Sequence, residues 1–192
     1  MIFKKTMKLP VAFLTDPYGL HIRALETVDK SREASAIAFA GMPEPMWLKS
    51  AGEDYFLCKE TKIHLYSGVK YDEGFELYEV PTSGWFVMYL NPVKTQTHTK
   101  RRIPLWESGE LSEFIQRACD HYFTGVTELE RMLIREIYLR KSSVSPSPIH
   151  TVMVWGRYDG LAEDFETKLL QGFGKCRSFG YGTPVLFTEV DK

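Results

Sequence analysis

Apolar and polar residues in the first half of the chain follow a pattern that predicts strands around one helix. Residues 2–14 are rich in Phe, Leu and Val and predict a strand. A helical pattern then opens at Asp16, with apolar residues spaced to lie on one face. A hairpin is predicted over 46–67, and the aromatic segment 84–93 predicts a further strand. One element, between residues 62 and 81, stays undetermined.

The second half repeats this order of elements. Residues 102–106 predict a strand, and 108–123 predict a helix. Residues 125–141 are ambiguous: their Glu, Leu, Arg and Met content favours a helix, whereas "LIREIYLRK" also alternates like a strand. The remaining predicted elements are a strand at 151–160, a helix at 161–171 that Gly172 ends, and a strand at 183–190.

With 125–141 as a strand, each half has the order βαββαβ. The sequence therefore predicts an α+β fold of two tandem ferredoxin-like domains. The predicted ranges are 1–90 and 105–192, joined by a basic, polar connector over 91–104.

The overall charge is close to neutral, with 24 Lys and Arg against 25 Asp and Glu. A role in binding nucleic acid therefore has to depend on local patches. Two stretches carry basic residues and no acidic ones, from Asn91 to Leu105 and from Thr167 to Thr188. A solvated loop is the plainer interpretation of any single charge run. The second run, however, coincides with a glycine-rich segment.

The cysteines and histidines predict no metal site and no cofactor. Cys58, Cys119 and Cys176 are far apart and lack a CxxC pattern, which fits a reducing cytosol. The histidines show no metal-ligand spacing. No run of residues approaches the ~18 to 20 apolar residues that a membrane helix needs. The expectation is a soluble cytoplasmic protein.

The segment "QGFGKCRSFGYGTPVLF", residues 171–187, concentrates glycine around a short basic core. Immobilised glycine costs conformational entropy, so the segment indicates a sharp bend or the close approach of a ligand. Lys175 and Arg177 favour an anionic ligand. The glycines could also permit tight packing of a helix against a strand, and the two roles are compatible because both need the same absent side chain. The spacing fits neither a P-loop nor a dinucleotide fingerprint. The four glycines are Gly172, Gly174, Gly180 and Gly182.

The same segment resembles the C-terminal glycine-rich signature of CasE (Cse3) proteins, a branch of the RAMP superfamily of CRISPR systems. Other segments resemble that family in the same order along the chain: "DPYGLHIRALE", "WFVMYLNPVKT" with "KRRIPL", and "IHTVMVWGRYDG". Between Glu33 and Pro81 no correspondence is visible.

The resemblance implies a metal-independent endoribonuclease that cuts CRISPR precursor RNA at its repeat stem-loops, as part of antiviral defence. Such an enzyme leaves 2′,3′-cyclic phosphate and 5′-hydroxyl ends. It then stays bound to the guide RNA as a subunit of a Cascade-type complex. The implied partners are repeat stem-loop RNA and other Cascade-type subunits, with no direct DNA contact and no membrane.

His21 is the candidate for proton transfer, because imidazole titrates near neutrality and the position matches the family's histidine. Tyr18, three residues earlier, can face the same groove and is implied to assist. The alternatives are a histidine satisfied at a helix N-terminus and a packing tyrosine. The cations Lys175 and Arg177, with amides exposed by the four glycines, are expected to hold the phosphate.

Other cations are candidates for contacts with RNA away from the cut. If 125–141 is a strand, alternate positions present arginines on one face. On a helix the same arginines would be ordinary solvent-facing charges, and the connector cations could equally belong to a solvated linker. These candidates are Lys94, Lys100, Arg101, Arg102, Arg135, Arg140 and Lys141.

Two other functions stay open. A non-catalytic RAMP-like subunit would bind guide RNA as a scaffold and share the fold. A small ferredoxin-like enzyme with a mononucleotide on its glycine loop would be stabilised by a nucleotide and not by hairpin RNA.

Overall fold

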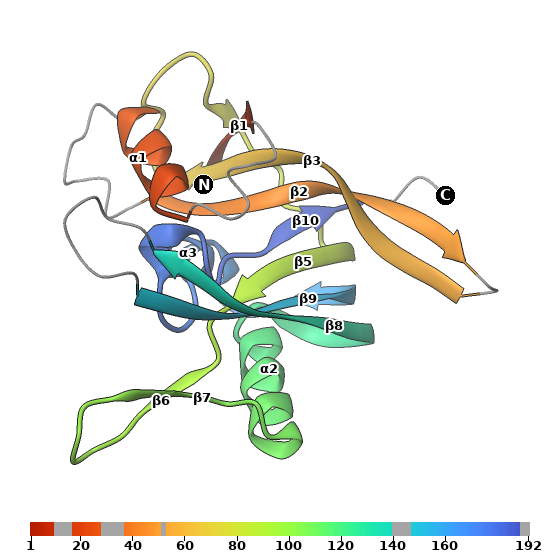
Figure 1. Ribbon diagram of the computed structural model, residues 1–192. Coiled ribbons are helices and arrows are strands. Elements are labelled where there is room, and N and C mark those ends of the chain that lie inside the picture. Colours follow the sequence, from red (N-terminus) through yellow and green to blue (C-terminus); the bar gives the residue numbers. More distant parts are fainter. Residues whose placement is uncertain (10–16, 28–36, 51–52, 140–146, 189–192) are drawn as a thin grey trace.

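In a computed structural model the chain forms two units, each built on an antiparallel four-stranded sheet, and the two sheets are stacked one above the other (Figure 1). Ile2 and Tyr66 from the first unit pack in one hydrophobic cluster with Phe86 and Val154 from the second unit, so a single core joins the sheets. The structure describes residues 1–9, 17–27, 37–50, 53–139 and 147–188.

The first sheet has the strand order of a ferredoxin-like unit. Its strands are β1 (Phe3–Leu9), β2 (Ile37–Ser50), β3 (Glu53–Ser67) and β4 (Glu76–Leu77), in the spatial order β2-β3-β1-β4. The helix α1 (Pro17–Thr27) connects β1 to β2. The stretch between residues 62 and 81, where one element was undetermined, contains the end of β3, then residues 68–75 without a helix, then β4. Residues 68–75 form turns instead, with the Asp72 carboxylate accepting the N–H of Gly74 at 2.7 Å.

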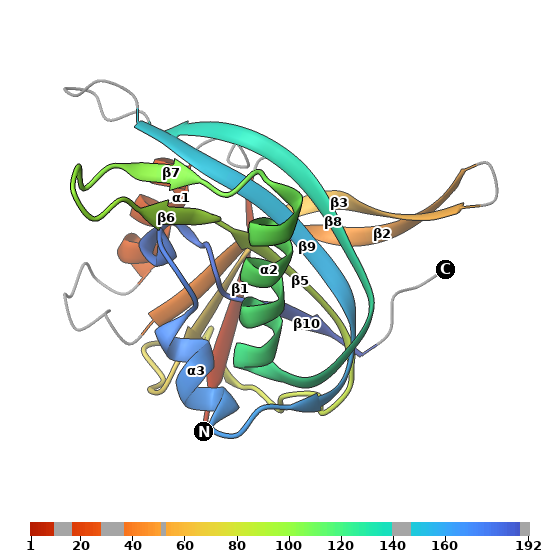
Figure 2. The same ribbon diagram turned by 90° about the horizontal axis from the view of Figure 1, so that it is seen from below.

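The second sheet repeats this order. Its strands are β5 (Gly84–Leu90), β8 (Phe123–Leu139), β9 (Ser147–Leu161) and β10 (Val185–Phe187), in the spatial order β10-β5-β9-β8. Its helices are α2 (Ser108–Tyr122) and α3 (Phe165–Gln171). Viewed from below, α2 crosses in front of this sheet (Figure 2). The expectation of two tandem ferredoxin-like units is confirmed.

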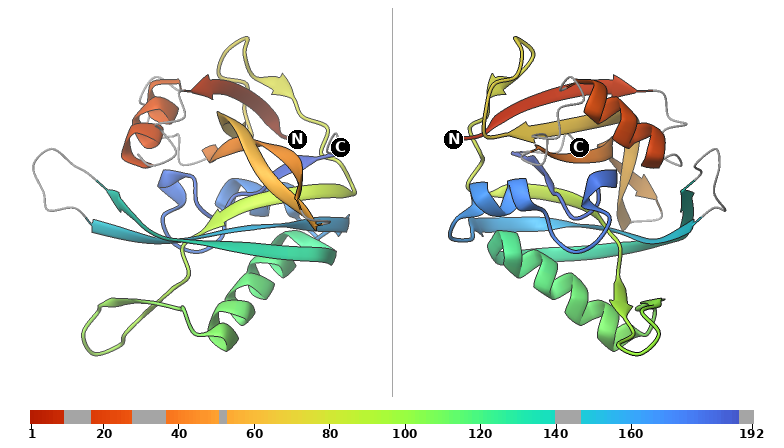
Figure 3. Two further views of the ribbon diagram at one scale, coloured as in Figure 1. Left: turned by 45° about the vertical axis from the view of Figure 1, so that its right-hand side comes forward. Right: turned by 90° about the vertical axis from the view of Figure 1, so that its left-hand side faces the viewer.

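Two strand assignments made from the sequence are wrong in their place within the fold. β5, assigned to the first half, is hydrogen-bonded between β10 and β9 and is the first strand of the second unit. The 102–106 strand is only β7 (Arg102–Pro104), which pairs with β6 (Val93–Thr95) and with neither large sheet. The β6–β7 hairpin projects away from both sheets (Figures 1 and 3). The predicted connector, residues 91–104, contains this hairpin. The second unit begins before it, at β5.

Residues 125–139 of the ambiguous segment lie in β8, an edge strand that pairs with β9 along its length, and residues 140 and 141 lie outside the described residues. Thr127 lies opposite Arg157, and Met132 lies opposite Met153. Tertiary pairing therefore overrides the helical preference of its Glu, Leu and Arg residues. No helix within the described residues is long and apolar enough to cross a membrane.

Candidate functional site

The short helix α1 carries both catalytic candidates on one side. It begins at Pro17, whose fixed φ and missing N–H suit the first position of a helix. Ala24 is buried and anchors the helix, whereas Tyr18 and His21 are half-buried. One helical turn separates the two aromatic rings, whose centroids lie 6.4 Å apart. The prediction that they share a face is consistent with this geometry.

The glycine-rich segment leaves α3 and forms a tight turn before β10. The N–H of Gly172 caps α3 by donating to the Lys168 carbonyl at 2.9 Å. The chain then forms the 3-10 helix η3 (Arg177–Phe179), which lies beneath α1 in Figures 1 and 3.

Gly182 is the glycine whose missing side chain the fold requires most clearly. Its φ is 74°, and a Cβ there would lie 1.8 Å from the Phe173 carbonyl oxygen. The Gly182 carbonyl accepts the N–H of Phe173 at 2.9 Å and the Tyr122 hydroxyl, while its own N–H donates to Tyr89 at 2.6 Å. At Gly182 the segment therefore packs tightly against the second sheet.

His21 and the glycine-rich turn meet in space, although 157 positions separate the contacting residues. The Nδ1 atom of His21 lies 2.7 Å from the Ser178 carbonyl oxygen. The Phe179 ring lies beside the imidazole, with centroids 5.4 Å apart. Because a carbonyl only accepts hydrogen bonds, Nδ1 carries the proton. In the neutral ring, Nε2 then holds the lone pair.

Three of the predicted cations lie on or near this turn. Lys175 and Arg177 belong to it and are exposed. Arg177 donates to the Gln171 carbonyl at 2.5 Å, and its side-chain stem lies where a Cβ on Gly172 would contact it at 3.2 Å. Gly172 therefore makes room for the arginine.

Arg102, from the β6–β7 hairpin, acts electrostatically on the same turn. Burial raises the pKa of the Cys176 thiol, whereas the hydrogen bond from Asn91, then Arg102 and Lys175, act to lower it. The hairpin and the turn thus bring cations from distant parts of the sequence to one thiol.

The other basic candidates lie elsewhere. Lys94 forms an ion pair with Glu110 at 2.5 Å, and Lys100 and Arg101 are exposed near the end of the β6–β7 hairpin. Arg135 lies opposite Thr151 in the β8–β9 register. Arg140 and Lys141 lie outside the described residues.

Two residues that shape the site were not singled out from the sequence as site residues. Ser178 acts through its backbone carbonyl, for which the sequence carries no side-chain signal. In the sequence, Asn91 marks only the end of a strand and part of a family-like segment. Its side chain donates a hydrogen bond to the Cys176 thiol at 3.0 Å.

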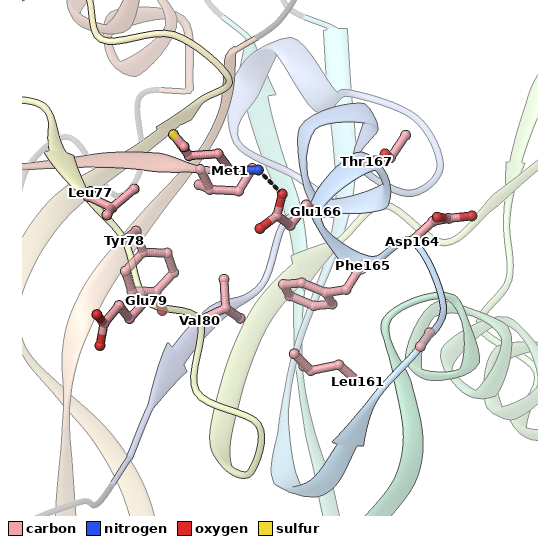
Figure 4. A pocket seen from close by; sticks show the side chains of 12 residues that line it. Met1, Leu77, Tyr78, Glu79, Val80, Leu161, Asp164, Phe165, Glu166 and Thr167 are labelled. Carbon is pink, nitrogen blue, oxygen red and sulfur yellow. Dashed lines mark hydrogen bonds and ion pairs between the residues drawn. The ribbon is translucent and has the colours of Figure 1, made fainter.

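A separate cavity of about 740 Å³ lies between the first sheet and α3 (Figure 4). Tyr78, Val80 and Phe165 contribute apolar surface, and the Met1 ammonium pairs with Glu166 beside it. None of the predicted site residues lines it. Within the described part of the chain, no three His, Cys, Asp or Glu side chains cluster so that they could hold a metal ion.

Solved CRISPR proteins share this fold over nearly the whole chain. Thermus thermophilus Cse3, bound to an RNA representing a pre-cleavage complex, is 16% identical with a TM-score of 0.65. That match covers 97% of this chain and 98% of that one. CRISPR endoribonuclease Cse3 bound to 19 nt RNA is 16% identical with a TM-score of 0.64, covering 97% and 100% of the two chains. Cas6e from Escherichia coli str. K-12 is 18% identical with a TM-score of 0.59, covering 97% and 98%.

At these identities the likeness establishes the fold, which is the fold that the sequence resemblance implied. No protein-family model and no curated protein matches the chain.

Proposed function

We propose that the chain is a metal-independent endoribonuclease that cuts CRISPR precursor RNA at repeat stem-loops. The observation that carries the proposal is the 2.7 Å contact between His21 and Ser178, which joins the candidate base to the glycine-rich turn. Structures with the same fold include an endoribonuclease bound to RNA and a pre-cleavage complex. The fold and the local chemistry therefore support one activity.

The proposed reaction is attack of a ribose 2′-hydroxyl on the adjacent phosphorus. The O2′–P bond forms as the P–O5′ bond breaks, which gives a 2′,3′-cyclic phosphate and a 5′-hydroxyl end. One proton leaves O2′ and another reaches O5′. With Nδ1 of His21 donating to Ser178, Nε2 is the ring atom that exchanges a proton with the RNA. Tyr18, one turn away, orients the nucleotide or serves the second proton transfer.

The turn supplies positive charge where the phosphate gains negative charge in the transition state. Lys175 and Arg177 are exposed on it, and Arg102 lies within electrostatic reach. Preorganised cations and N–H groups stabilise such charge without reorganising during the reaction. Gly174, which is exposed with a φ of 75°, lets a phosphate approach the backbone closely.

The RNA stem is proposed to lie along the β6–β7 hairpin and the basic positions of β8. An A-form major groove is too narrow for side chains to read, so contacts with phosphates and stem shape should dominate recognition. Lys94 would exchange its ion pair with Glu110 for a phosphate.

The cut guide RNA is proposed to stay bound within a Cascade-type complex in the cytoplasm. A chain of this fold is found in a CRISPR RNA-guided surveillance complex.

The deciding experiment is cleavage of CRISPR-repeat hairpin RNAs by the purified chain in EDTA. We expect one cut at the base of the stem, with a 2′,3′-cyclic phosphate on the upstream product. His21→Ala should abolish cutting and leave RNA affinity nearly intact. Glu26→Ala is the matched control on the same helix, since Glu26 is exposed and pairs with Arg23 at 3.1 Å.

Other outcomes identify the competing functions. A wild-type chain that binds the hairpin RNAs and cuts none of them is a scaffold subunit. Thermal stabilisation by a mononucleotide, with none by hairpin RNA, indicates a nucleotide-binding enzyme.

A further inference from the structure

The glycine-rich turn is fastened on both sides to the end of β5. On one side the Cys176 thiol accepts the hydrogen bond from the Asn91 side chain at 3.0 Å. On the other side the N–H of Gly182 donates to the Tyr89 carbonyl at 2.6 Å. The end of β5, an inner strand of the second sheet, therefore holds the turn that meets His21.

The backbone at Cys176 determines how the turn begins. Its φ of 64° lies in the left-handed region, which is unfavourable for a residue with a Cβ. Its carbonyl accepts the N–H of Phe179 at 2.9 Å, which closes the first turn of η3. Ser178 lies inside this turn. Cys176 is therefore one of the residues that set the direction of the Ser178 carbonyl.

Asn91 is well placed to hold that conformation. The residue is 4% exposed, and its Oδ1 atom has no hydrogen-bond partner among the described residues. A buried polar atom without a partner costs stability and calls for an explanation. The explanation is that Asn91, at the end of β5, is kept there because its side chain holds Cys176.

We infer that Asn91 is a positioning residue for His21. Through Cys176 it sets the turn so that the Ser178 carbonyl faces Nδ1 and keeps the proton on that nitrogen. The catalytic meaning of this arrangement rests on the proposed function, because it leaves Nε2 to exchange a proton with RNA. The hydrogen bonds themselves belong to the folded chain and can be tested without RNA.

Nitrogen-15 NMR of the histidine rings distinguishes the two neutral tautomers. We expect His21 of the wild-type chain to be protonated on Nδ1. Asn91→Ala removes the donor and Cys176→Ala removes the acceptor, so each should shift His21 toward a mixture of both tautomers. Cys176→Ser keeps an acceptor for Asn91 and should keep the wild-type tautomer.

The matched control is Tyr181→Phe, in the same segment. It removes the buried hydrogen bond between the Tyr181 and Thr151 hydroxyls, which are 2.9 Å apart, and removes neither partner of the hydrogen bond between Asn91 and Cys176. We expect lower stability and an unchanged His21 tautomer. A tautomer shift as large as that of Asn91→Ala would show that general weakening of the segment is responsible, which would overturn the inference. Cys176→Ala decides the test if Asn91→Ala does not fold.

Single-turnover cleavage gives the second measurement. Both alanine variants should lower the rate constant at saturating RNA by on the order of 10- to 100-fold, with little change in RNA affinity. A His21 tautomer unchanged in both variants overturns the positioning role. A shifted tautomer in a chain that cuts no hairpin RNA leaves that role intact and overturns the proposed function instead.

Discussion

Gly182 shows how a single residue determines whether the glycine-rich turn can form. Replacing it with alanine would place a Cβ 1.8 Å from the Phe173 carbonyl oxygen at a φ of 74°. We expect Gly182→Ala to lower the free energy of unfolding by at least about 2 kcal/mol, from left-handed strain and a disturbed hydrogen bond. Urea unfolding measures this loss.

Gly109 provides the control for that substitution. It lies in the first turn of α2, and a Cβ there would meet nothing within 4 Å. Gly109→Ala should therefore raise stability by roughly 0.4–1 kcal/mol, because alanine reduces the entropy of the unfolded chain. Equal effects of the two substitutions would contradict the packing argument for Gly182.

His121 should make stability depend on pH. Burial, and then the Lys168 ammonium, lower its pKa from 6.5 in the folded chain. The unfolded chain therefore binds a proton at His121 more readily than the folded chain does. The free energy of unfolding falls as the pH drops below 6.5 and through the lower pKa of the folded chain. His121→Gln should weaken the acid dependence of the urea midpoint. An identical pH profile in the variant would exclude His121 as its source.

At the residue scale, the sequence predicts side-chain chemistry and misses backbone geometry. Tyr18, His21 and the four glycines carry signals in their type and spacing, and the structure brings His21 and the glycine-rich turn together. The Ser178 carbonyl accepts the hydrogen bond from His21, but every residue has a backbone carbonyl, so the sequence gives no sign of this one. The link from Asn91 to Cys176 spans 85 positions, and no local pattern reveals it.

At the scale of elements, the β6–β7 hairpin makes the clearest prediction about RNA. Lys100 and Arg101 are exposed near its end, and the hairpin projects away from α1, the helix that carries His21 (Figure 1). Replacing both with glutamine should weaken RNA binding and reduce the salt slope of log affinity by about one per charge removed. The cleavage rate constant at saturating RNA should stay unchanged. Binding titrations over a salt series, with single-turnover cleavage, measure both quantities.

Lys70→Gln is the control for this double substitution. Lys70 is exposed and pairs with Glu73 at 3.3 Å in the turns between β3 and β4, on the opposite side of the molecule from the hairpin (Figure 1). It should leave the salt slope unchanged. If the salt slope of log affinity falls as much as in the hairpin variant, the effect comes from the net charge of the protein and not from contacts between the hairpin and RNA.

The element that the sequence predicts best is the long helix α2, whose apolar residues recur at helical spacing. α2 buries Leu111, Ile115, Ala118 and Tyr122 at helical spacing, and the predicted helix matches it. β5 and β7 were misplaced because strand propensity does not state which neighbour a strand pairs with. Residues 68–75 could not be assigned as an element because the first unit has turns there, where the second unit has α3.

At the scale of the whole molecule, the two sheets share one core. Ile2 and Tyr66 belong to the same hydrophobic cluster as the buried residues of β5 and β9. β5 is buried along most of its length because it lies in the centre of the second sheet. Removal of this strand should therefore lower the stability of the second unit far more than removal of an edge strand would.

Two fragments test the place of β5 in the second unit. The predicted C-terminal range 105–192 lacks this strand, which separates β10 from β9, so we expect it to show no cooperative unfolding in urea. A fragment of residues 81–192 keeps all six elements of the second unit, and Pro81 retains its carbonyl as acceptor for the Tyr158 hydroxyl at 3.0 Å. It should unfold cooperatively at a lower urea concentration than the full chain, because the first sheet no longer covers its core. Cooperative unfolding of 105–192 would instead show that β9 and β10 fold without their central neighbour.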